Sequence, residues 1–177
     1  MGATFSRTKP ATAVLDFVFD FAARLGADTI DTASCTVTNA TKDAESNDDT
    51  TATVRVSGGA NGVAAKVLCH IVTTLGYEYE NTLALEIADH QILNPILKAP
   101  AEVLAIPAPT WSDLNGDAIS SYAWAAQTGL TIASGGSSAT VVISGGTLGS
   151  DYTLTCTITT ASGQVDVRQR LIQVRER

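Results

Sequence analysis

Apolar and polar residues alternate along several short stretches of the chain, a period-2 pattern that indicates β-strands with one buried face. The clearest stretch runs from Tyr152 to Ile158, where every second residue is apolar and threonines stand between. Leu15–Asp20 alternates in the same way, with two phenylalanines on the apolar side. Helical periodicity is not sustained over any stretch long enough to span a domain. The pattern therefore predicts an all-β protein.

The chain is an internal duplication, because residues 53–76 return as residues 140–163 with 10 of 24 aligned positions identical and no gap. The shared positions include a Ser-Gly-Gly segment, in which glycine supplies the positive φ of a hairpin loop. Upstream the spacing changes from 87 to 89, so the first copy carries two extra residues. We expect them in a surface loop within the polar stretch 42–49, since loops absorb insertions at little cost.

Each copy has about five candidate strands, which favours two small antiparallel β-sandwiches in tandem. The predicted organisation is a flexible arm over residues 1–9, a first domain over 10–88, an apolar linker over 89–98 and a second domain over 99–177.

Two segments are candidate partner-binding regions. The linker is unusually apolar and is expected to pack either on its own chain or on a partner, through Ile92, Leu93, Ile96 and Leu97. The last strand carries every cation of the second copy after residue 98, which suggests either a solvated strand or a docking strip for an acidic neighbour, formed by Arg168, Arg170, Arg175 and Arg177. Its apolar residues change phase midway, so we expect a bulge there.

Composition narrows the function. The chain is 45% apolar and 16% charged, as globular proteins are, and its net charge of −7 argues against nucleic-acid binding. It has no apolar run long enough for a membrane span, and its first residues lack the apolar core of a secretory signal.

The sequence offers little chemistry. Cys35, Cys69 and Cys156 are expected to be small buried apolar residues, with a Cys35–Cys69 bridge between sheets as the alternative. No catalytic residue or cofactor is predicted, because neither His70 nor His90 lies beside a nucleophile and the glycines belong to hairpins.

A calcium loop and a simple polar turn are both compatible with one acidic segment. Asp113, Asn115 and Asp117 have the spacing with which such a loop begins, but the bidentate glutamate that should follow is missing. The polar turn is the favoured interpretation, and no metal site is predicted.

Four motifs carry a family resemblance: Val14-Leu15-Asp16-Phe17, then Leu25–Ile30, Val54–Gly59 and Thr73–Gly76. With them, each copy resembles a unit of tailed-phage virion proteins of the fiber-tail adaptor or Ig-like virion type. The resemblance implies two Ig-like sandwiches in a non-enzymatic, multi-copy structural protein without cofactor.

The expected role is that of an adaptor or decoration that docks capsid, neck, tail or fiber proteins. It would be a homo-oligomer or symmetric array in the virion, assembled in the bacterial cytoplasm. The alternative is an exported Ig-like module of a bacterial surface or carbohydrate-binding protein, with the Cys35–Cys69 bridge and Trp111 as a sugar platform.

Overall fold

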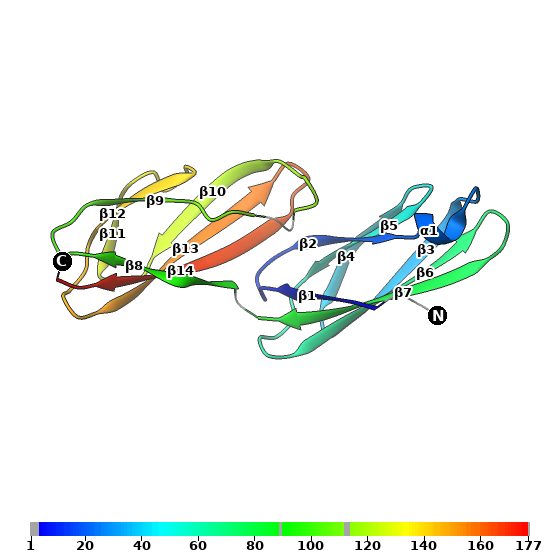
Figure 1. The fold of residues 1–177 in the computed structure, drawn as a ribbon, viewed down its shortest axis with the longest axis horizontal. Coiled ribbons are helices and arrows are strands. Elements are labelled where there is room, and N and C mark those ends of the chain that lie inside the picture. The colour runs from blue at the N-terminus through cyan, green and yellow to red at the C-terminus, as the bar shows by residue number, and fades with distance from the viewer. Residues whose placement is uncertain (1–3, 89, 112–113, 177) are drawn as a thin grey trace. The chain divides into compact units, whose positions relative to one another are not determined.

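The computed structural model describes residues 4–88, 90–111 and 114–176, and over residues 90–94 it defines the backbone alone. The chain forms two compact units, Met1–Ala88 and Asp89–Arg177 (Figure 1). Unit one contains β1 (Thr4–Lys9), β2 (Leu15–Asp20), α1 (Ala22–Leu25), β3 (Ile30–Thr38), β4 (Thr41–Asn47), β5 (Thr51–Ser57), β6 (Ala64–Thr73) and β7 (Glu78–Ile87). Unit two contains β8 (His90–Lys98), β9 (Leu104–Pro107), β10 (Ile119–Ala126), β11 (Leu130–Ser134), β12 (Thr140–Gly145), β13 (Asp151–Thr160) and β14 (Val165–Val174).

Each unit is a β-sandwich of a four-stranded and a three-stranded sheet. The orders are β1-β7-β6-β3 with β2-β5-β4 in unit one, and β8-β14-β13-β10 with β9-β12-β11 in unit two. Corresponding strands occupy the same places in the sheets of the two units, so the units share one topology. This confirms the all-β prediction of two tandem sandwiches. Across the described residues, helix content amounts to the four residues of α1, and no helix there has the length and apolarity to cross a membrane.

The first strand of each unit corrects two sequence expectations. Residues 4–9 form β1, which pairs in parallel with β7, so they are not a flexible arm. Residues 90–98 form β8, which pairs in parallel with β14, so they are a strand of unit two and not a linker. The physical reason is the same in both cases, because the added strand satisfies backbone groups along the edge of the last strand.

Each first strand ends in a buried lysine, a feature that the sequence analysis missed. Lys9 and Lys98 are both 0% exposed. The Lys9 Nζ donates to Pro10 O and Gly58 O at 2.9 Å each. The Lys98 Nζ donates to Ala99 O, Pro100 O and Gly145 O at 2.8, 3.2 and 2.6 Å. Both ammonium groups therefore tie the first strand to the Ser-Gly-Gly loop of their own unit.

The polar stretch of the first copy forms an edge strand where a loop was expected. Every residue of β4 is exposed, yet the strand pairs along β5 with one bulge. Its Glu45 Oε2 accepts a hydrogen bond from Cys35 N at 2.9 Å, which covers part of the β3 edge. At the same place in unit two, Trp124 N donates to Gly136 O at 2.9 Å. Both copies thus protect this edge, by different residues.

Candidate docking surfaces

Strand β14 turns two of the candidate arginines toward the interior of its sandwich. Arg168 pairs with Cys156, and Arg170 pairs with Leu154. Cys156 and Leu154 are buried, so all four side chains belong to the inward face of the sheet. The β13–β14 register contains no shift, so the predicted bulge does not occur in that pairing, and an irregularity appears instead against β8, just after Arg170.

Arg168 binds the irregular segment that follows β9. Its Nε lies 3.6 Å from Oδ2 of Asp166, a carboxylate 1% exposed. Its Nη1 donates to Thr110 O at 2.8 Å, and its guanidinium carbon lies 4.7 Å from the ring centroid of Trp111. Strand β9 ends at Pro107, and Ala108 N still donates to Ala139 O at 2.7 Å, so the Arg168 contacts position the next residues, Thr110 and Trp111.

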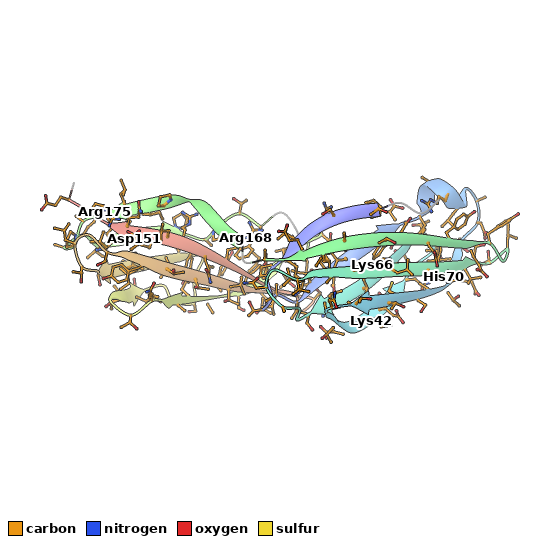
Figure 2. All side chains as sticks on the ribbon, turned by 90° about the horizontal axis from the view of Figure 1, so that it is seen from below. Lys42, Lys66, His70, Asp151, Arg168 and Arg175 are labelled. Carbon is orange, nitrogen blue, oxygen red and sulfur yellow. The ribbon has the colours of Figure 1, made fainter. Side chains whose placement is uncertain are left out.

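The remaining candidates are dispersed. Arg175 donates to Asp151 Oδ1 at 2.5 Å and to Ser150 O at 3.1 Å, and Figure 2 shows it beside Asp151 at the end of β14 away from Arg168. Ile96 is half-buried and Leu97 is 46% exposed. Arg177 and the side chains of Ile92 and Leu93 lie outside the described residues. The partner-binding role of these eight residues stays a prediction.

The outward face of the sheet β10-β13-β14-β8 is a better docking candidate. Its residues alternate with the buried ones, and none of its described side chains is charged except Asp151 at one end, where Arg175 pairs with it. We call this surface the neutral face; its residues are Leu97, Ser121, Ala123, Ala125, Thr153, Thr155, Thr157, Thr159, Val165, Val167, Gln169, Leu171 and Gln173.

The corresponding face of unit one is charged. With the repeat spacing of 87, Val167 and Val165 correspond to Glu80 and Glu78, and Thr157 corresponds to His70. His70 pairs across the ladder with Glu80, as Thr157 does with Val167, so the two faces have the same geometry. The Nε2 of His70 also lies 3.4 Å from a carboxylate oxygen of Glu78. Charged residues favour a solvated surface, whereas their absence lowers the desolvation cost of docking.

The acidic turn of unit two has a structural role. Asn115 and Gly116 adopt positive φ, as a turn requires, and Asp113 lies outside the described residues. Asp117 Oδ2 accepts a hydrogen bond from Ser162 Oγ at 2.5 Å. This hydroxyl is the main cause that lowers the pKa of Asp117 to about 2. The carboxylate thereby binds the turn between β13 and β14.

The equivalent acid in unit one does the same. Asp28 Oδ1 accepts hydrogen bonds from Thr74 Oγ1 at 2.5 Å and from Thr29 N at 2.8 Å. Hydrogen bonding to Thr73 and Thr74 lowers the pKa of Asp28. Within the described residues no group of three potential metal ligands is found. The carboxylates of Asp28 and Asp117 instead accept hydrogen bonds from turn residues.

An open hollow of about 260 Å³ lies on the outer face of β2-β5-β4. Its floor includes Asp16 and Arg55, joined by two hydrogen bonds of 2.7 Å. The bidentate geometry makes this a strong cross-strand pair. Ala44, Glu45, Ser46 and Thr53 complete the lining.

The fold defines a tandem Ig-like β-sandwich protein. A family model described as podophage GP4 fiber-tail adaptor protein gp77 matches residues 9–86 and 98–173, once for each unit. The chain therefore belongs to this fiber-tail adaptor family, and the expected resemblance is confirmed.

Solved structures with tandem Ig domains are also similar. The two Ig domains of DIP-gamma match at 10% identity and TM-score 0.35, over 100% of this chain and 96% of theirs. Titin Ig tandem domains match at 12% identity and TM-score 0.30, over 99% and 95%. A SusE-like polysaccharide-binding protein of Bacteroides thetaiotaomicron matches at 12% identity and TM-score 0.35 over 98% of this chain, which spans 33% of that protein. No curated protein matches the chain.

Proposed function

We propose that this chain is a non-enzymatic structural protein of a phage virion, which docks a tail or fiber protein through the neutral face. Membership of the adaptor family supports a virion role with tail or fiber partners. The observation that carries the docking site is the loss of charge from one of two duplicated faces. A chain with a net charge of −7 repels most acidic neighbours, and the described side chains of this face bring no charge into a contact apart from Asp151, which is paired with Arg175.

The size of the face fits a modest interface. Strands β13 and β14 have ten residues each. At about 3.4 Å per residue and about 4.8 Å between strands, four strands give a flat footprint of roughly 500 Å². That is below the roughly 800 Å² per partner of a standard interface, so a single contact is weak and repetition around a symmetric particle supplies avidity.

The duplication itself provides the test variants. Val167→Glu introduces the residue that unit one carries at the same sheet position, Glu80, so the variant is expected to fold. A charge left without a partner in the contact should weaken docking by about 3 kcal/mol, or roughly 150-fold. The matched control is Val18→Glu, since Val18 is 47% exposed on the three-stranded sheet of unit one.

Incorporation into virions is the readout. Particles assembled with each variant are purified by density, and the chain is quantified by mass spectrometry against the major capsid protein. We expect a fixed, symmetry-compatible ratio for the wild type and for Val18→Glu, and a large loss for Val167→Glu. Equal incorporation of both variants would reject the neutral face, and absence of the wild type from particles would reject the virion role altogether.

A further inference from the structure

Two cysteine thiols face each other inside unit one. Cys35 on β3 and Cys69 on β6 are direct cross-strand partners, and both point into the core. Their exposed fractions are 2% and 0%. The Sγ–Sγ distance is 2.7 Å, longer than the disulfide bond of about 2.05 Å but short for two sulfur atoms that are not bonded. The pair lies within one sheet, and so differs from the bridge between sheets that the sequence suggested.

The backbone already satisfies most of what a bridge requires. Directly opposed residues of an antiparallel pair have Cα atoms about 4.5–5.5 Å apart, which lies within the range of disulfides. Their Cβ atoms need to approach by at most about 1 Å. The same position in unit two pairs Trp124 with Cys156, so the second copy holds a single thiol there.

We propose that Cys35 and Cys69 are a modification site at which oxidation forms a cross-strand disulfide. The bond joins β3, an edge strand of its sheet, to the interior strand β6. It closes a loop across a sequence separation of 34 residues and thereby reduces the conformational entropy of the unfolded chain.

A small-molecule disulfide such as oxidised glutathione is the oxidant. One cysteine thiolate attacks it, forms a mixed disulfide and releases one glutathione thiolate. The second cysteine thiolate then attacks the sulfur of the first and releases the other. The protein gives up two protons and two electrons, and two molecules of glutathione are formed.

The contact distinguishes the two thiols. Hydrogen bonding between them lowers the pKa of Cys35 and raises the pKa of Cys69. Cys35 lies on an edge strand, so local opening of β3 is the route by which the oxidant reaches the pair.

The test refolds the full chain from denaturant in glutathione buffers, one oxidising and one reducing, so that burial does not limit access. Free thiols are blocked under denaturing conditions and the protein is digested with trypsin. In the oxidising buffer we expect peptide 25–42 linked to peptide 67–98, with Cys156 as the one blocked thiol. In the reducing buffer we expect three blocked thiols. The linked form should unfold at a temperature higher by roughly 10 °C.

Three variants provide the controls. Cys35→Ala and Cys69→Ala should each abolish the response of the unfolding temperature to the oxidising buffer, whereas Cys156→Ala should retain it in full. The proposal is overturned if the wild type refolds in oxidising buffer with three free thiols, with glutathione on single cysteines, or with bridges to Cys156. It is equally overturned if the linked form is no more stable than the reduced form.

Discussion

Replacing Lys98 by methionine tests whether a buried ammonium group holds unit two together. Lys98→Met keeps the length of the side chain and removes its charge and all three of its hydrogen bonds. Ala99 O retains a second donor, Glu102 N at 3.1 Å. The oxygens of Pro100 and Gly145 lose the ammonium donor at a part-buried site.

The expected loss follows from these contacts. Hydrogen bonds from a charged donor contribute about 1.5–3 kcal/mol each after exchange with water. The methionine buries apolar atoms in the same space and offsets about 1–2 kcal/mol of this. We expect a net destabilisation of about 3 kcal/mol. For a unit of this size that lowers the urea midpoint by roughly 2 M.

Tryptophan fluorescence during urea unfolding reports on unit two alone, because Trp111 and Trp124 are the only tryptophans of the chain. In unit one the exposed Lys66 supplies Lys66→Met as the control for Lys9→Met, and circular dichroism should show a change within about 0.5 kcal/mol for it. Lys9→Met should shift the transition of unit one, followed by circular dichroism. A Lys98→Met midpoint equal to or above that of the wild type would refute the argument, because the ammonium would then contribute nothing net.

Three further results are expected. The pKa of Asp117 is lowered to about 2, so the stability contributed by this carboxylate is complete above the unfolded pKa near 4 and is lost as the pH falls through 2. Ser162→Ala should raise the pKa of Asp117 in an NMR titration. Arg168→Ala should release Thr110 and Trp111, seen as a red shift and stronger quenching of Trp111 fluorescence; an unchanged spectrum in a Trp124→Phe background would contradict that role. Burial raises the pKa of Cys156 to about 11, so its alkylation at pH 8 should follow unfolding rather than thiol ionisation.

The alternation of apolar and polar residues and the internal repeat were sufficient to predict the sandwiches, because every second residue of each strand faces the core. The same rule failed in β14, where Arg168 and Arg170 occupy inward positions that the pattern assigned to solvent. The partners of Arg168, Thr110 and Trp111, lie more than 50 residues away in sequence. A local pattern carries no information on such contacts.

The two buried lysines belong to a motif that is repeated in the sequence, but the sequence alone does not indicate their role. Lys9-Pro10 returns in the second copy as Lys98-Ala99-Pro100, and the Ser-Gly-Gly segment is also repeated. Nothing in the sequence indicates that the lysine contacts this segment. Only the parallel pairing of the first strand with the last brings the ammonium group to the loop carbonyl. The neutral face could not be predicted from the sequence, because its residues come from four strands. Their shared lack of charge can be recognised only when the register of those strands is known.

The parallel pairing of β1 with β7 has a mechanical consequence. Tension enters unit one at the start of β1 and leaves it at the end of β7, and the ladder between them runs from Thr4 and Thr82 to Lys9 and Ile87. Pulling the two ends apart slides one strand along the other, so the bonds of the ladder share the load and must break together. Antiparallel terminal strands would instead peel apart one bond at a time. Unit two repeats the arrangement with β8 and β14, so each sandwich is built to resist stretching along the chain.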